Sequence, residues 1–375
     1  MIFNINQDVL LDAINIIQRG LPQKTPLPIL NGIKLEVFDD HIIFTSSNTD
    51  IAIQTVISDS SLEVLSPGRI VVPGRYLIDI TRKLEGRVEM SLIEQKILVI
   101  RSDRVEYKLN VMDVEDYPDV DFIEMGKPIL FDSRTLKSII RETNYATSQY
   151  EKRPILTGVN FKFNSDGKLY CVATDSYRLS QKILHLDYDE PFNIVIPNKS
   201  LDELSRIIDT VGDDIEMFIS PNKVLFKFSN ILFQTRLLDG VYPDTLRIIP
   251  TEFPIIIKFN KDDLLRSVER VSLLSPRDRE HNYNIIRLQV KKDYSVEISS
   301  TNTEIGDAQE IIIPTDDVIG PAIKIAFSSK YLTEALKSFS SNEVVLNFAG
   351  EIKPFVIKGE LDPDVLHLIL PVRIE

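Results

Sequence analysis

Residues 131–137 read Phe-Asp-Ser-Arg-Thr-Leu-Lys, and the pattern of this stretch occurs twice more in the chain. The counterparts are residues 5–11, Ile-Asn-Gln-Asp-Val-Leu-Leu, and residues 259–265, Phe-Asn-Lys-Asp-Asp-Leu-Leu. In each, an Asn or Asp follows an apolar residue, and its side chain can accept hydrogen bonds from the free amides of a first helical turn. The pattern therefore predicts three helices with the same beginning, capped by Asn6, Asp132 and Asn260.

Three further patterns recur in the same order and at about the same spacing. A second helix opening stands at 73–77, 197–201 and 328–332; a Thr-acid pair at 49–50, 174–175 and 303–304; and a closing turn at 117–119, 242–244 and 362–364. Four patterns that each occur three times, in register, do not arise by chance. They predict three tandem similar domains, with limits at 1–126, 127–252 and 253–375.

Between these patterns the chain is typical of strands, because apolar residues are continuous or alternate with period two. Such segments are 42–44, 97–100, 159–163, 224–228, 296–298 and 344–346. The predicted fold class is α+β, in which each copy has two helices packed on antiparallel sheets.

Composition excludes several classes of protein. Of the 375 residues, 43% are hydrophobic, and the net charge is −13, which argues against a nucleic-acid partner when taken alone. No apolar stretch reaches the roughly 18–20 residues that span a bilayer, and the first residues lack the features of a signal peptide. A single cysteine, Cys171, cannot form an internal disulfide. We expect a soluble cytoplasmic protein without a membrane partner.

The placement of charge changes what the total implies. The six candidate helices, over 6–19, 75–84, 133–144, 197–208, 260–271 and 328–339, sum to +4, and the rest of the chain to −17. Basic residues seven or four apart share a helix face; these pairs are Arg75 with Arg82, Lys199 with Arg206, Lys330 with Lys337, Lys137 with Arg141, and Arg266 with Arg270. Without a base-reading motif, such faces suit sequence-independent contact with a nucleic-acid backbone. An ordinary solvated surface is the alternative.

The sequence makes no positive case for catalysis. Gly-rich phosphate loops and a nucleophile elbow are missing, and the histidines have no metal-site spacing. We expect no catalytic residue, metal or cofactor. Two other hypotheses stay open: an interaction scaffold of three α+β repeats without a DNA role, and an enzyme that uses Asp175.

Read together, the patterns resemble the bacterial DNA polymerase III β subunit, the sliding clamp family. The resemblance covers the whole chain and is most specific at 26–30, 172–179, 237–244, 270–274 and 368–373. It implies the DNA clamp fold: two chains join head to tail in a closed ring, with basic helices around double-stranded DNA. Such a ring slides without reading sequence and holds the polymerase on its template, and it does no chemistry itself.

The resemblance also implies partners. These are the DNA polymerase III catalytic subunit, an ATP-driven clamp loader, and other proteins with a clamp-binding motif, namely repair polymerases, mismatch-repair proteins and ligase. Their short peptides would dock in a cleft between the second and third domains, with Arg178 and Arg247 as polar handles at its rim. At matching positions the cleft comprises Leu156, Thr174, Ser176, Tyr177, Arg178, Leu179, Pro243, Arg247, Ile248, Pro354, Leu368, Leu370, Pro371 and Val372.

Matching positions extend to DNA contact and to the dimer. Lys24 and Arg153 would join the helical cations as DNA-facing residues. The dimer would pair Leu273 and Leu274, after the first helix of the third domain, with the edge of the first domain near Tyr107.

Overall fold

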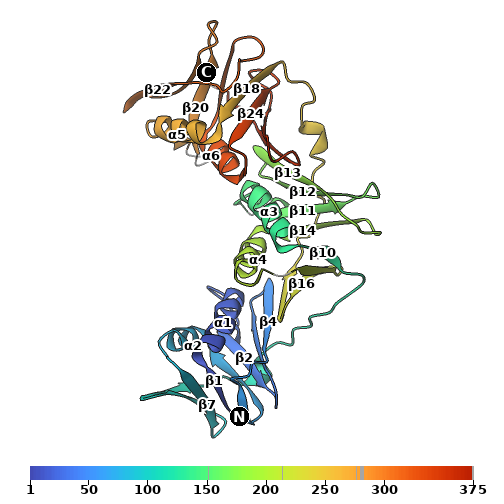
Figure 1. The fold of residues 1–375 in the computed structure, drawn as a ribbon, viewed down its shortest axis with the longest axis vertical. Coiled ribbons are helices and arrows are strands. Elements are labelled where there is room, and N and C mark those ends of the chain that lie inside the picture. Colours follow the sequence, from blue (N-terminus) through green and yellow to red (C-terminus); the bar gives the residue numbers. More distant parts are fainter. Residues whose placement is uncertain (151, 213, 276, 279–282, 374–375) are drawn as a thin grey trace. The chain divides into compact units, whose positions relative to one another are not determined.

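The computed structural model describes residues 1–150, 152–212, 214–275, 277–278 and 283–373. Within these residues, each copy contributes two α-helices, and all of them overlap the helical segments predicted from sequence (Figure 1). They are α1 (Gln7–Ile17), α2 (Gly74–Thr81), α3 (Ser133–Thr143), α4 (Asn198–Val211), α5 (Lys261–Ser272) and α6 (Ser329–Ser338).

The predicted caps hold at two of the three matched helices. The side chain of Asn260 accepts from the amides of Asp262 and Asp263, each at 3.1 Å, and that of Asp132 accepts from Thr135 at 2.9 Å. Asn6 stands at the corresponding position, but its side chain makes no cap hydrogen bond, so the prediction of a capping role for Asn6 is wrong.

The first copy contributes a five-stranded antiparallel sheet. Its order is β5 (Glu63–Ser66), β1 (Ile2–Asn6), β7 (Arg87–Ile93), β8 (Ile97–Ser102), β9 (Val105–Asn110). A second sheet has eight strands, in the order β10 (Ile129–Phe131), β15 (Ile215–Ile219), β16 (Lys223–Phe228), β17 (Ile231–Arg236), β4 (Ile51–Ile57), β3 (Ile42–Ser47), β2 (Gly32–Val37), β6 (Gly68–Pro73).

Two more antiparallel sheets follow the same plan. The eight-stranded one has the order β14 (Phe192–Pro197), β11 (Gly158–Phe163), β12 (Lys168–Thr174), β13 (Arg178–His185), β26 (Val365–Ile369), β25 (Phe355–Gly359), β24 (Glu343–Phe348), β18 (Ile255–Asn260). The last runs β19 (Arg277–Asp278), β20 (Tyr283–Val290), β21 (Val296–Asn302), β22 (Gly306–Ile312), and β23 (Ile323–Ser328) pairs with β20.

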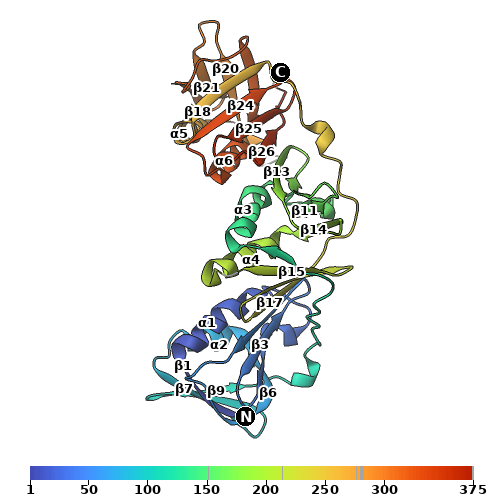
Figure 2. The ribbon, with the colours of Figure 1, turned by 45° about the vertical axis from the view of Figure 1, so that its right-hand side comes forward.

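The eight-stranded sheets cross the limits between copies. In the first, β17 of the second copy pairs with β4 of the first copy; in the other, β26 of the third copy pairs with β13 of the second (Figure 2). Each sheet thus joins four strands from one copy to four from the next. For this reason the compact units do not coincide with the copies: one comprises Met1–Lys137 and Lys199–Leu237, the other Ser138–Asn198 and Leu238–Glu375.

Strand register gives the true alignment of the copies. Ser47 pairs with Ala52 across the β3–β4 turn, and Thr174 pairs with Leu179 across the β12–β13 turn. The side chains that follow, Asn48 and Asp175, each accept hydrogen bonds from the amides two and three residues later. The counterpart of Thr174-Asp175 in the first copy is therefore Ser47-Asn48, and the predicted match with 49–50 is wrong by two residues.

The closing turn of the third copy also needs correction. Residues 117–119 follow β9 and residues 242–244 follow β17, whereas residues 362–364 precede β26. The third match was a chance resemblance inside the β25–β26 hairpin.

Matched helical positions supply the core. Leu10, Leu136 and Leu264 are buried under their helices, and Ile14, Ile140 and Val268 lie one turn further on and are buried too. Among the described residues, no helix is both long enough and apolar enough to cross a bilayer.

Candidate functional site

A pocket of about 190 Å³ lies where the end of the chain meets the β12–β13 turn. Backbone hydrogen bonds hold the end of the chain there: the amide of Leu370 donates to the carbonyl of Tyr177 at 3.0 Å, and that of Val372 to Ala326 at 2.7 Å. The lining residues are Tyr177, Ser328, Tyr331, Leu370, Pro371 and Val372.

The turn that carries Tyr177 is held by its own side chains. The carboxylate of Asp175 accepts from the amides of Tyr177 and Arg178 at 2.9 and 3.0 Å, and the hydroxyl of Thr174 donates to the carbonyl of Arg178 at 2.5 Å. Ser176 has a φ of +79°, a left-handed conformation that these bonds enforce. The turn leaves the Tyr177 side chain 42% exposed at the pocket.

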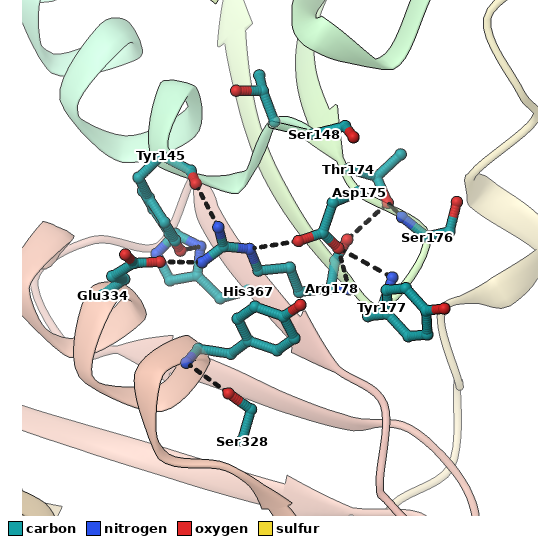
Figure 3. A network of polar contacts seen from close by, with 12 residues as sticks. Tyr145, Ser148, Thr174, Asp175, Ser176, Tyr177, Arg178, Ser328, Glu334 and His367 are labelled. Atoms are coloured by element: carbon teal, nitrogen blue, oxygen red, sulfur yellow. Dashed lines mark hydrogen bonds and ion pairs between the residues drawn. The ribbon is translucent and has the colours of Figure 1, made fainter. Parts of the chain in front are cut away.

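Arg178 is buried, with 5% of its surface exposed, and its guanidinium lies against the ring of the pocket residue Tyr331. Figure 3 shows its polar contacts. Its Nε donates to Asp175 at 3.0 Å, one terminal nitrogen pairs with Glu334, and the other donates to the carbonyl of Tyr145 at 2.5 Å. The guanidinium carbon lies 4.5 Å from the ring centre of Tyr331 and 5.2 Å from that of Tyr145. The interpretation of Arg178 as a handle at the rim is therefore wrong, because its donors are used inside the protein.

Burial and charge act in opposite directions on this ion pair. Burial lowers the pKa of Arg178, but the charges of Asp175 and Glu334 outweigh it, so that the pKa rises above its ordinary value. Burial raises the pKa of Asp175, and Arg178 counteracts that effect. Both oxygens of Asp175 are engaged in this structural network, which removes the candidate on which the enzyme hypothesis depended.

The other predicted cleft residues fall into two groups. Leu179 and Leu368 are buried in a small apolar cluster with Val172 and Val356, against which Tyr242 packs. Leu156 and Thr174 are buried as well, whereas Pro243, Arg247 and Ile248 lie exposed on the segment after β17, where Arg247 pairs with Asp244 at 2.9 Å. Pro354 is half-buried just before β25.

Two residues of the pocket, Ser328 and Tyr331, are not among the predicted cleft residues. Ser328 caps α6 by accepting from the amide of Tyr331 at 3.2 Å, and Tyr331 lines the pocket. The stretch 328–332 was interpreted only as a helix opening, and a capping serine with an aromatic residue three positions on gives no signal of a pocket.

The predicted DNA-facing cations lie on the surface. Lys24 stands in the loop after α1, Arg153 precedes the short 3₁₀ turn η5 (Pro154–Thr157), and Arg82 directly follows α2 and donates to Gln18 at 2.8 Å. Others are paired with acids: Lys137 with Asp209, Arg141 with Glu142, Arg206 with Glu203, Arg266 with Asp263, Arg270 with Glu310, and Lys337 with Glu269.

Three of these cations share a position. Arg75, Lys199 and Lys330 are each the second residue of their helix and are exposed. Over the described ranges, none of the three has an acidic partner within 4 Å.

The predicted dimer residues are also at the surface: Tyr107 is half-buried on β9, Leu274 is half-buried after α5, and Leu273 is 80% exposed.

Fold and pocket together define a three-domain α+β protein whose sheets run from one domain into the next. Family models of the DNA polymerase III beta subunit match it in order: the N-terminal domain at residues 1–121, the central domain at 131–244 and the C-terminal domain at 246–373. The chain therefore belongs to the DNA polymerase III beta subunit family.

Individual relatives agree. The chain is 39% identical to the beta sliding clamp of Staphylococcus epidermidis over 380 residues, which cover 100% of this chain and 99% of that protein. It is also 39% identical to the beta sliding clamp of Bacillus subtilis, over 100% of both chains. The crystal structure of the DNA polymerase sliding clamp from Bacillus subtilis matches with a TM-score of 0.94 over both whole chains, at 38% identity.

Proposed function

We propose that this chain is a sliding clamp: two copies close head to tail around duplex DNA, and the ring tethers the replicative polymerase without reading sequence. It does no chemistry and needs no cofactor. Family membership and the full-length similarity to beta sliding clamps support this function. The observation that carries this proposal concerns two edge strands, β9 and β22. At these two strands the pairing that joins one copy to the next has no partner among the described residues.

In the other copies, the strand equivalent to each edge strand is paired on both sides. Strand β9 follows β8 as β17 follows β16 and β26 follows β25, and β22 follows β21 as β4 follows β3 and β13 follows β12. Strands β17 and β26 pair with β4 and β13. In the described residues, β9 and β22 each have a strand on one side only. An exposed edge is a template for pairing with another chain, so β9 of one copy can pair with β22 of a second.

The internal pairs predict the register of that contact. Phe233 lies opposite Ile53 and His367 opposite Ser180. Tyr107 occupies the place of Phe233 and His367, and Ala308 the place of Ile53 and Ser180. Tyr107 should therefore lie opposite Ala308 of a second copy. Since Phe233 and His367 are fully buried, the contact should also bury the half-exposed Tyr107.

The ring predicts a specific cross-link one position along. Glu106→Cys and Gln309→Cys should form two intermolecular disulfides per dimer, because residues directly opposite in an antiparallel pair meet the spacing that a disulfide needs. Glu106 and Gln309 are exposed, and the native Cys171 is buried, so that only the introduced thiols should react. Loaded on nicked circular DNA by the clamp loader and then oxidised, the ring should resist high salt and be released by linearisation of the DNA.

The matched control is Glu106→Cys with Asp307→Cys, which shifts one thiol by two residues, or roughly 7 Å along the strand. That pair should not cross-link efficiently, since the α-carbons would be too far apart. Cross-linking only within one chain, or equal retention on circular and linear DNA, would contradict the ring and favour the scaffold hypothesis.

Three helix cations that have no acidic partner within 4 Å among the described residues support an anionic ligand. A helix N-terminus carries partial positive charge, so that Arg75, Lys199 and Lys330 stand where a cation is unfavourable. Proximity to phosphates would reverse that effect. We infer that these residues contact the DNA backbone in all three copies. Lys24, Arg153 and the remaining helical cations add to the positive electrostatic potential that attracts the DNA phosphates.

The pocket suits short peptides from partner proteins, with apolar side chains seated among Tyr177, Leu370, Pro371 and Val372. We propose as partners the DNA polymerase III catalytic subunit, the clamp loader, repair polymerases, mismatch-repair proteins and ligase, in the cytoplasm. The predicted cleft residues Leu156, Thr174, Leu179 and Leu368 would support the pocket from below, and Arg247 and Ile248 would border it. We also propose that the functional domains are 1–126, 127–252 and 253–375.

Tyr177→Ala should weaken binding of the polymerase's C-terminal peptide about tenfold or more, because exposed aromatic residues at a pocket are frequent anchors of binding. Fluorescence anisotropy of the labelled peptide measures the change. The matched control is Tyr294→Ala, which removes a tyrosine of similar exposure (58%) on the β20–β21 turn. Unchanged affinity in the Tyr177 variant would refute this assignment of the cleft.

A further inference from the structure

A larger pocket, of about 270 Å³, lies on the eight-stranded sheet that joins the first two copies. Its walls come from the loop before β2, from the β3–β4 turn, from the segment after β9, and from the ends of β16 and β17. The residues that decide its chemistry are Leu27, Leu30, Asp50, Asp119, Lys223 and Arg236.

This pocket occupies the same place in the repeat as the cleft proposed for partner peptides. Gln234 pairs with Ala52 where Leu368 pairs with Leu179. The amide of Arg236 donates to the carbonyl of Asp50 at 3.0 Å, as that of Leu370 donates to Tyr177 at the same distance.

The surroundings of the two sites correspond as well. The 3₁₀ turn η2 (Pro28–Asn31) reads Pro-Ile-Leu-Asn before a glycine, and η5 reads Pro-Ile-Leu-Thr before a glycine. The leucines of these turns, Leu30 and Leu156, are both buried. Tyr117 is buried in an apolar cluster with Leu30, and Tyr242 packs against the apolar cluster that contains Leu179. The chain therefore builds the same concave framework twice.

The chemistry of the two sites differs at one side. Arg236 stands at the position of Leu370, and Lys223 at that of Pro354, which precedes Phe355 on the neighbouring strand. Lys223 and Arg236 lie directly opposite each other, and like charges in that arrangement are destabilising. In the part of the chain that the structure describes, neither has an acidic partner within 4 Å. A ligand carboxylate would remove this repulsion.

The other residues that line the pocket indicate the rest of the ligand's chemistry. Leu27 is 51% exposed, and Leu30, Ile51 and Ala52 are buried around the pocket, which suits an aliphatic side chain. The volume is below the roughly 300 Å³ at which small-molecule sites begin, so side chains of an extended peptide fit better than a cofactor. Asp50 and Asp119 line the pocket too and would repel a uniformly acidic ligand.

We propose that this pocket is a second peptide-binding site, which takes a segment with one acidic side chain next to an aliphatic one. The carboxylate pairs with Lys223 and Arg236, and the aliphatic group packs on Leu27 and Leu30. The site is distinct from the cleft near Tyr177, and its existence does not depend on the proposed ring.

The test uses the full-length protein and the probe acetyl-Leu-Asp-Leu-amide, titrated by saturation-transfer NMR. Lys223→Ala and, separately, Arg236→Ala should each weaken binding roughly fivefold to tenfold, since each removes a charge-assisted hydrogen bond. The matched control Lys96→Ala removes an exposed lysine on the β7–β8 turn and should leave the affinity unchanged.

The comparison peptides acetyl-Leu-Asn-Leu-amide and acetyl-Leu-Lys-Leu-amide should bind several-fold more weakly than the acidic probe. Equal affinity for the Asn peptide, preference for the Lys peptide, or no saturable binding up to about 10 mM would overturn the proposal. Loss of binding in Tyr177→Ala would place the probe in the other cleft and would also overturn it, while leaving the clamp function intact.

Discussion

Arg178→Ala should destabilise the unit that contains the pocket by about 3–5 kcal/mol, because removal of one partner leaves buried charge uncompensated. Asp175 would lose its cation inside the protein, and the carbonyl of Tyr145 would lose its donor. Tyr331 would lose the guanidinium on which its ring rests. We therefore expect this substitution to weaken peptide binding indirectly, through loss of the pocket's shape.

Urea unfolding followed by circular dichroism measures the effect, as a shift of the unfolding transition to lower urea. The matched control is Arg247→Ala: this arginine also pairs with an aspartate three residues away, but its side chain is 87% exposed. Its removal should leave unfolding almost unchanged. If the two variants unfold alike, burial of Arg178 does not have the structural role assigned here.

Lowering the pH from 7 to about 5 should cost about 2 kcal/mol of stability through His367 alone. Burial lowers the pKa of His367 from 6.5 to about 3, an effect that Asp362 opposes and Arg178 strengthens. The imidazole contacts the hydroxyls of Tyr145 at 2.9 Å and Ser338 at 2.7 Å. Between the two pKa values the unfolded chain binds a proton that the folded chain does not, so stability is full above about pH 6.5 and falls as the pH drops.

Comparison with His367→Gln isolates this contribution, because the other titrating groups are common to both proteins. The variant should be less stable than the parent at pH 7, and the difference should narrow toward pH 5. A difference that stays constant over this range would show that His367 does not titrate between its folded and unfolded states as expected.

Local patterns predicted the helices well. The matched stretches at 5–11, 131–137 and 259–265 each begin a helix, and their leucines four residues after the cap are buried. Helical periodicity and capping act over one or two turns, so a single sequence contains the information. The wrong prediction of a cap at Asn6 did not affect the prediction of the helix, because α1 starts at Gln7 without that hydrogen bond.

Side-chain roles were predicted less well. Thr174-Asp175 was matched to 49–50 by residue type, whereas strand register matches it to Ser47-Asn48. Arg178 was expected at a rim, yet Glu334, 156 residues away, pairs with it in the interior. Tyr331 was not recognised as a pocket residue at all. The errors at Arg178 and Tyr331 concern partners that are distant in sequence, which local pattern does not identify. The error at 49–50 is local: residue type alone did not give the register of the β3–β4 turn.

The sequence by itself determined the threefold repeat, the positions of the helices and the concentration of basic residues on them, because these depend on periodicity and on residues close together in the chain. Only the tertiary structure decided that sheets cross from copy to copy, that β9 and β22 are edges among the described strands, and that Arg178 is buried against the pocket residue Tyr331. The physical reason is strand pairing: a sheet joins segments such as β4 and β17, about 180 residues apart, and their register depends on which faces the whole fold buries.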